Sequence, residues 1–142
     1  MKFAKFLMLG VMAIALSACG SARRTNVIEP VDVRTTPRVF FAFDRYDITP
    51  EARNNLLGQS LFLKQNEHIN ITIEGHADER GTLEYNFALG ARRANAARQV
   101  LINDGICPNR IHTVSYSWTR PYRQGTGEAV WRYNRNATTV VR

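Results

Sequence analysis

Apolar and polar positions alternate in different ways along the chain, and each change of pattern marks an element. The aromatic run Val39–Phe43 predicts a buried strand. Apolar residues at helical spacing then predict an amphipathic helix from Thr49, its N-cap, to about Asn66. Residues 69–74 alternate isoleucine with polar residues, and this predicts a half-buried strand that stops at Gly75.

The second half of the chain continues this order. An alanine-, leucine- and arginine-rich stretch from Leu83 to about Asn103 predicts the longest helix, with Gly105 as a stop signal just after it. Residues 111–116 and 138–141 predict two more strands, separated by an irregular segment with room for a short helix. The order β-α-β-α-β-β indicates an α+β fold, a two-layer sandwich with helices packed on a mixed four-stranded sheet.

Residues 1–18 have the pattern of an export signal. A charged start precedes the apolar run Phe6–Ala18, which is too short to span a bilayer, where about 20 residues are needed. The run ends in Leu-Ser-Ala-Cys, with the cysteine at Cys19, and resembles the bacterial lipobox. The resemblance implies cleavage before Cys19, a lipid anchor on its thiol and, because Gly20 replaces an aspartate, sorting to the outer membrane. An ordinary secretory peptide ending near a cysteine is the alternative.

The rest of the chain divides into a tether and one domain. Residues 19–36 are polar and predict the lipidated cysteine followed by a flexible tether, which at about 17 extended residues reaches about 55 to 60 Å. Residues 37–142 are long enough to bury a core and form the single folded domain, facing the periplasm. Cys107 is its one cysteine, and we expect burial near a helix end, since an unpaired thiol in an oxidising compartment is buried, reactive or bonded to another chain.

The chain is basic, with a formal net charge of +7. Loss of Lys2 and Lys5 with the export signal leaves +5, carried almost entirely by arginine because Lys64 is the only remaining lysine. Arginines interleaved with aromatic residues between positions 116 and 133 have a pattern also found in nucleic-acid binding. An exported chain does not meet nucleic acid, so we expect no such partner and assign these aromatics to the core or to partner contacts.

The most informative segment, Gly75–Asn95, lies where a strand passes into a helix. Asn86 and Arg93 are two helical turns apart and share one face of that helix, and Asp78 lies on the loop that leads to it. Asp78 can accept from an ammonium group, and Arg93 can hold a carboxylate in a fork, so together they suit an α-amino-acid group. A salt bridge between Asp78 and Arg93 themselves is the alternative, and the residues alone leave both open.

The same segment, with Phe41–Ile48 before it and Ser115–Arg135 after it, resembles the OmpA-like domain family, and most closely its branch of peptidoglycan-associated lipoproteins (Pal). The resemblance implies non-covalent binding of peptidoglycan through the diaminopimelate of its stem peptide, which ties the outer membrane to the cell wall without cofactor or catalysis. The family's binding aspartate and arginine fall on Asp78 and Arg93. Its neighbouring site residues fall on His76, Arg80, Gly81, Thr82, Tyr85, Asn86 and Leu89.

The resemblance also implies TolB and other Tol proteins as partners, in envelope integrity and cell division. This chain departs from the family at Asn136, where a second arginine is usual. It also departs at Ser117, where glycine is usual, and at Trp118 and Thr119, where charged residues are usual. Its tether is also short. These departures leave Asp78 and Arg93 untouched and bear on the Tol contact, so a paralogue serving another envelope complex, such as a secretion apparatus, is the alternative.

Titratable residues in and around the motif suggest one other class, a periplasmic metal-dependent hydrolase. Its candidate groups are His68, His76, His112, Asp78, Glu79 and Glu84. The spacing argues against it, because His76 and Asp78 are two apart on a loop and no helix carries paired histidines. We therefore expect no metal site and no enzymatic activity, and we interpret His76 mainly as a structural loop residue whose ring bonds a neighbour.

Overall fold

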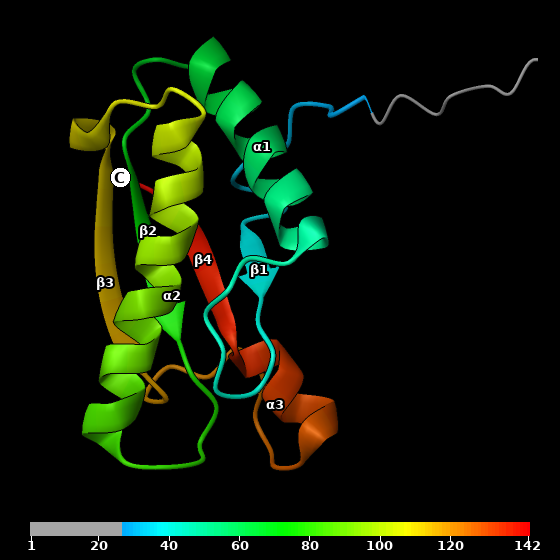
Figure 1. The fold of residues 1–142 in the computed structure, drawn as a ribbon, viewed down its shortest axis with the longest axis vertical. Coiled ribbons are helices and arrows are strands. Elements are labelled where there is room, and N and C mark those ends of the chain that lie inside the picture. Colours follow the sequence, from blue (N-terminus) through cyan, green and yellow to red (C-terminus); the bar gives the residue numbers. More distant parts are fainter. Residues whose placement is uncertain (1–26) are drawn as a thin grey trace, which may run out of the picture.

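Helices and strands alternate along the chain in the computed structural model, which describes residues 27–142. Figure 1 shows the two long helices, α1 and α2, lying across the same side of the sheet. The elements are β1 (Arg38–Phe40), α1 (Pro50–Gln65), β2 (Ile71–His76), α2 (Leu83–Asn103), the 3-10 helix η1 (Pro108–Arg110), β3 (Ile111–Ser117), α3 (Glu128–Asn134) and β4 (Asn136–Val141).

The four strands form one mixed sheet in the order β1-β4-β2-β3. The last strand, β4, pairs antiparallel with both β1 and β2, whereas β2 and β3 are parallel. A parallel pair needs a crossover connection, and α2 provides it. The predicted α+β fold with helices on a mixed four-stranded sheet is confirmed, and the irregular segment before β4 contains the short helix α3.

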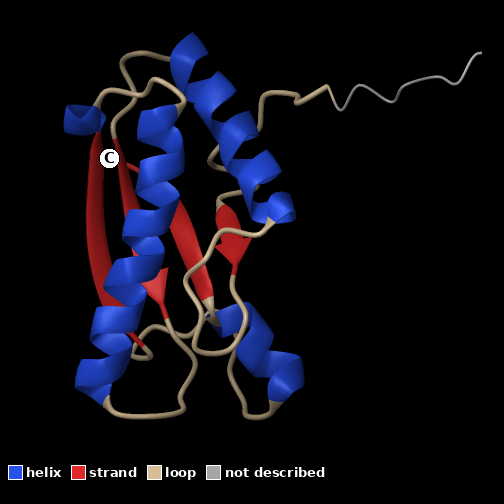
Figure 2. Cartoon of the chain, in the orientation of Figure 1, coloured by secondary structure: helices blue, strands red, loops and turns tan. Residues whose placement is uncertain are grey.

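The core lies between the sheet and the two long helices, which cover one of its faces (Figure 2). Ile71 and Ile73 of β2 are fully buried there, together with Leu56 and Leu63 of α1 and Leu101 of α2. Burying one side chain of this size contributes about 1.5 to 3 kcal/mol. This layer fixes where α2 sits on the strands that lead to the site.

Helix α2 lies very close to the sheet because two glycines face each other. A Cβ on Gly75 of β2 would stand 1.8 Å from the carbonyl oxygen of Gly90, and one on Gly90 would stand 2.3 Å from Ser115 Oγ. Only residues without a side chain allow this approach. The helix starts after Thr82, whose hydroxyl accepts from Tyr85 N at 3.2 Å. Its first turns therefore lie beside the end of β2.

Strand β1 is shorter than predicted, ending at Phe40 instead of Phe43. Its partner β4 begins at Asn136, directly opposite Phe40, so the ladder has no further pairs. The left-handed backbone of Asp44, with a φ of 56°, then turns the chain away. The aromatic run is therefore divided between a short strand and a loop.

The other boundaries agree more closely with the pattern. The hydroxyl of Thr49 accepts from Ala52 N at 3.2 Å and caps α1 as predicted, and α2 has its predicted bounds. Strand β2 continues past its predicted stop at Gly75 to His76, because β3 pairs with it that far. Strand β4 begins at Asn136, two residues before the predicted start, because β1 pairs with those residues.

Cys107 is exposed, so the prediction of its burial is wrong. After α2, Gly105 takes a φ of 101°, and Ile106 turns into the core, where only 3% of it is exposed. The buried position near the helix end thus belongs to Ile106, and the following residue faces outward.

Part of the predicted tether packs on the domain. Val31 N donates to Gly58 O of α1 at 2.9 Å, and Val33 is 1% exposed. The predicted signal peptide and Cys19 lie outside the described residues. Between residues 27 and 142 we find no helix with the length and hydropathy that crossing a membrane would require.

Candidate functional site

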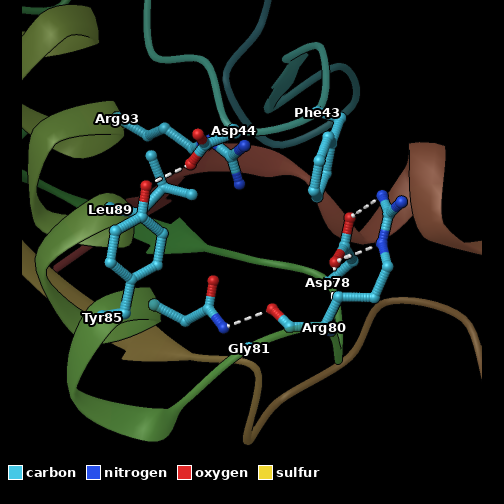
Figure 3. A pocket seen from close by; sticks show the side chains of 9 residues that line it. Phe43, Asp44, Asp78, Arg80, Gly81, Tyr85, Leu89 and Arg93 are labelled. Carbon is cyan, nitrogen blue, oxygen red and sulfur yellow. Dashed lines mark hydrogen bonds and ion pairs between the residues drawn. The ribbon is translucent and has the colours of Figure 1, made fainter.

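A cavity of about 220 Å³ opens between the loop after β1, the loop after β2 and the first turns of α2. We call it the Asp78 pocket, and Figure 3 shows it from close by. Its lining residues are Phe43, Asp44, Asp78, Arg80, Gly81, Tyr85, Asn86, Leu89 and Arg93. Seven of these nine are site residues that the sequence predicts, and two, Phe43 and Asp44, are not.

Asp78 follows β2 and is 4% exposed, so its carboxylate needs charge partners. Arg80 donates from Nη2 to Oδ2 at 2.7 Å and from Nε to Oδ1 at 3.1 Å, and Arg135 Nη1 lies 3.3 Å from Oδ2. Burial alone would raise the pKa of Asp78, but its hydrogen bonds to Arg80 and Arg135 outweigh this and hold the pKa below its usual range. The side chain is therefore a fixed anion at neutral pH.

Arg80 is held between two aromatic rings. Its guanidinium carbon lies 3.8 Å from the ring centre of Phe43 and 4.1 Å from that of Trp131. Such stacking restrains the planar group while its N–H groups bond the carboxylate of Asp78. The Asp78 and Arg80 pair thus forms one wall of the pocket, and Figure 3 shows the two side chains facing each other.

Arg93 enters the pocket from α2 and is fully buried. It donates to three backbone carbonyls, those of Arg45 at 2.8 Å, His76 at 2.8 Å and Ala42 at 3.2 Å. Burial lowers the pKa of Arg93 to about 10, against the opposing effect of Asp78, so the guanidinium stays charged at neutral pH. Three of its five N–H groups are engaged in this way, which leaves two for other acceptors.

Asp78 and Arg93 do not pair with each other, so the alternative of a salt bridge between them is wrong. Among the described residues, the carboxylate of Asp78 pairs with Arg80 and Arg135, while Arg93 contacts carbonyls. The pocket therefore presents a carboxylate and a separate guanidinium. A ligand with both an ammonium and a carboxylate group matches this arrangement.

Asn86 ties the loop after β2 to α2. It is 3% exposed, and its Nδ2 donates to Arg80 O at 2.7 Å and to Thr82 O at 3.1 Å. Between these two carbonyls, Gly81 has a φ of 97°, a left-handed conformation that favours glycine. A Cβ there would also stand 3.2 Å from Asn86 Nδ2. These residues set the shape of the pocket floor.

Tyr85 and Asp44 close the opposite side. The hydroxyl of Tyr85 donates to Asp44 Oδ1, an interaction drawn in Figure 3. This hydrogen bond raises the pKa of Tyr85. Half of Tyr85 remains exposed, whereas Leu89, one turn further along α2, is buried and supplies an apolar contact.

Two predicted site residues do not line the Asp78 pocket. Thr82 is the N-cap of α2, and His76 turns its ring to another cavity, where Nε2 lies 3.6 Å from Glu74 Oε2. His76 is the last residue of β2, so the prediction of a loop position is wrong, while the predicted contact of its ring with a neighbour is limited to this 3.6 Å approach to Glu74. Only the backbone carbonyl of His76 serves the pocket, by accepting from Arg93.

Sequence reasoning missed three residues that shape the site. Phe43 and Asp44 lie in Phe41–Ile48, a segment already used for the family resemblance. That resemblance was the signal that could have identified them as site residues. Arg135 ends the other segment used for the resemblance, Ser115–Arg135, but no local pattern shows that it pairs with Asp78, 57 positions earlier in the chain. Its fork to Glu128, at 2.6 and 3.1 Å, holds it in place.

The described part of the chain offers no group of three or more His, Cys, Asp or Glu side chains placed to hold a metal ion.

Comparisons with known proteins show which proteins this chain resembles. A family model described as OmpA family matches residues 40–135. A peptidoglycan-associated lipoprotein of Mesorhizobium japonicum is 39% identical over 128 residues, which cover 90% of this chain and 76% of the relative. The peptidoglycan-associated lipoprotein of Haemophilus influenzae is 35% identical over 147 residues, covering 96% of each chain.

Solved structures share the fold. The crystal structure of the peptidoglycan-associated lipoprotein from Burkholderia pseudomallei superimposes with a TM-score of 0.72 at 37% identity, covering 75% of this chain and 90% of the other. The C-terminal domain of Helicobacter pylori MotB reaches a TM-score of 0.68 at 19% identity, covering 75% and 84%, and this likeness concerns the fold alone.

Proposed function

The chain belongs to the OmpA family, whose model matches residues 40–135, and from this membership we propose that it binds peptidoglycan non-covalently through the Asp78 pocket. Bound in this way, it anchors the outer membrane to the cell wall. Relatives named peptidoglycan-associated lipoproteins, 35 to 44% identical over most of the chain, support this role. They also support a binding protein and not an enzyme.

The observation that carries the proposal is the pair of unlike charges that the pocket keeps apart. The ligand group that we propose is the diaminopimelate of the stem peptide, whose side chain ends in an ammonium and a carboxylate. Asp78 accepts from the ammonium, sharing its oxygens with Arg80. Arg93 donates to the carboxylate through the N–H groups that its three carbonyl partners leave free.

The other predicted site residues have supporting roles in this proposal. Arg80 holds Asp78, and Tyr85 and Leu89 flank the ligand on α2. Asn86, Gly81 and Thr82 shape the loop and the helix start. His76 acts through its backbone carbonyl on Arg93, away from direct ligand contact.

The remaining parts of the proposal concern attachment and partners. We propose that the lipid on Cys19 holds the chain in the outer membrane with its domain in the periplasm, and that TolB and other Tol proteins are partners in envelope integrity and cell division. A lipoprotein serving another envelope complex is the second candidate, favoured by the departures at Asn136 and Ser117. Both residues are buried, at 1% exposure each, so these two departures change the packing and not the surface that a partner meets, which weakens the case for the second candidate.

The proposal is tested by replacing Asp78 with a neutral residue of the same size. We expect Asp78→Asn to bind isolated sacculi with an affinity lowered by about tenfold or more, because one charge-assisted hydrogen bond contributes about 1.5 to 3 kcal/mol. The measurement is the amount of full-length protein that sediments with the sacculi. The matched control is Asp104→Asn, which removes a carboxylate paired with Lys64 at 2.8 Å near the far end of α2. Circular dichroism checks that both variants are folded.

Equal sedimentation of Asp78→Asn and the unsubstituted chain would place the wall site elsewhere. Asp78 also pairs with Arg135, so Asp78→Asn removes an internal contact as well as the ligand group. A second measurement therefore uses the unsubstituted chain. Titrating the isotope-labelled chain with free diaminopimelate should shift the backbone NMR signals of Asp78, Asn86 and Leu89. No shift at saturating ligand would contradict the proposed ligand.

A further inference from the structure

The sheet face opposite α1 and α2 carries a second cavity, of about 230 Å³. Strand register places Arg38 opposite Thr138, and Thr138 opposite Glu74, so the three side chains point to this same face. The ring of His76, two residues after Glu74, lines the cavity as well. We call it the His76 cavity. It has no lining residue in common with the Asp78 pocket.

Two arginines bring positive charge to this cavity. The guanidinium of Arg38 lies 4.0 Å from the ring centre of Tyr122, and that of Arg120 lies 3.7 Å from the ring centre of Tyr116. Within residues 27–142, neither forms a salt bridge with a carboxylate. Stacking on a ring restrains a guanidinium while its N–H edges stay available to a planar acceptor.

Buried nitrogen atoms in the cavity wall also lack partners. His76 is 6% exposed, and its Nδ1 has no hydrogen-bond partner in the described part of the protein. The same is true of Arg38 Nε. Buried polar atoms are nearly always paired. Arg38 Nε carries a hydrogen, so it points to an acceptor that the chain does not itself supply, whereas His76 Nδ1 is the lone-pair nitrogen of a ring whose Nε2 faces Glu74 and does not bind a carboxylate.

The charge balance selects the kind of ligand. Burial lowers the pKa of His76, against the opposing effect of Glu74, and the two arginines lower it further, so the ring is neutral at pH 7. Arg38, Arg120 and Glu74 then leave one positive charge. A carboxylate, with a single negative charge and a planar shape, neutralises it, whereas a doubly charged phosphate would leave an excess beside Glu74.

We propose that the His76 cavity binds one carboxylate group of an acidic peptide segment, held by Arg38 and Arg120. The peptide source follows from the surroundings, because Tyr122, which lines the cavity, is 47% exposed. Exposed aromatic residues and arginines are enriched where proteins bind each other. This binding is independent of the proposed wall binding, which uses a different set of side chains.

The test is an NMR titration of the isotope-labelled full-length chain in detergent. The probe is an end-blocked peptide with one glutamate among neutral residues, and its control is the same peptide with glutamine. The glutamate peptide should shift the side-chain Nε–H signals of Arg38 and Arg120 and raise the pKa of His76, because its charge offsets that of the arginines. The glutamine peptide should do neither.

Variants separate the cavity from general charge. Arg120→Gln should weaken binding of the glutamate peptide by about tenfold or more. Arg53→Gln, which removes an exposed arginine of α1, should leave it unchanged. Both variants should sediment with sacculi like the unsubstituted chain. Asp78→Asn should bind the glutamate peptide normally, so failure of the wall proposal and failure of this one give different results.

Three results would overturn the proposal. One is the absence of shifts at Arg38 and Arg120, and another is equal peptide binding by Arg120→Gln. The third is tighter binding of inorganic phosphate than of the glutamate peptide, which would assign the cavity to a phosphate group. Arg120→Gln should fold, because Arg120 is exposed. Arg38→Gln provides an independent second variant.

Discussion

Arg93 shows how one residue can serve both the fold and a ligand. Its side chain is fully buried, and its three hydrogen bonds join the loop after β1 to the end of β2. Those carbonyls belong to residues up to 51 positions away, so the guanidinium holds together two loops that both line the pocket. Removing it therefore affects stability as well as binding.

We predict that Arg93→Ala lowers the free energy of unfolding by about 3 kcal/mol or more, because buried carbonyls lose charged donors worth about 1.5 to 3 kcal/mol each. Urea unfolding of the full chain measures the change. The control is Arg92→Ala, at the exposed neighbouring position, which should change stability little. Equal unfolding midpoints for both variants would contradict the prediction.

At the scale of elements, the position of α2 decides whether the site exists. The Gly75 and Gly90 contact brings the helix onto β2, and the same helix carries Asn86, Leu89 and Arg93 into the pocket. Intrinsic propensity and packing oppose each other at Gly90. Alanine is favoured over glycine inside a helix by about 1 kcal/mol, but here a methyl group has no room.

We predict that Gly90→Ala destabilises the protein by about 1 to 3 kcal/mol, the usual cost of overpacking, instead of stabilising it. Ser115 Oγ, 2.3 Å from the added Cβ, is the nearest obstacle. The double variant Gly90→Ala, Ser115→Ala should therefore cost less than the sum of the two single changes. Urea unfolding of all three variants gives the comparison, and a stabilising Gly90→Ala would show that α2 can move off the sheet.

At the scale of the whole molecule, the proposed function needs two attachments on one chain. The Asp78 pocket is proposed to hold the wall, and the lipid on Cys19 is proposed to hold the membrane. The domain begins to pack by Val31 to Val33, so the residues between Cys19 and Val31 set how far the pocket reaches from the membrane.

We predict that Cys19→Ser moves the protein from the membrane fraction to the soluble periplasmic fraction, because the acylated thiol is lost. Sedimentation with sacculi should be unchanged, since the pocket does not depend on the lipid. Fractionation of cells and immunoblotting measure the first effect, and the sacculus assay measures the second. Membrane retention of Cys19→Ser would remove the lipid anchor from the proposal.

Local patterns were sufficient for most of the architecture. Helical spacing and the cap Thr49 predict α1, and an alanine-, leucine- and arginine-rich stretch with Gly105 after it predicts α2, because backbone preferences and capping act within a few residues. The strand ends were less predictable, since a ladder stops where its partner stops. β1 ends at Phe40 for this reason, although the apolar run continues to Phe43.

For the site, the motif on Gly75–Asn95 was enough to predict seven of the nine lining residues, because all seven lie on one loop and the helix after it. It was not enough to predict which charges pair. Asp78 pairs with Arg80 and Arg135 and leaves Arg93 to backbone carbonyls, which only three-dimensional packing could arrange.

The sequence alone thus specified the helices, the strands and the cluster of polar residues after β2, because these depend on residues close to one another along the chain. The folded arrangement chose the partners of each buried charge and turned His76 away from the Asp78 pocket. It also buried Ile106 and left Cys107 exposed. The reason is physical: burial and ion pairing depend on segments that meet across more than fifty residues, and no local pattern records which of them will meet.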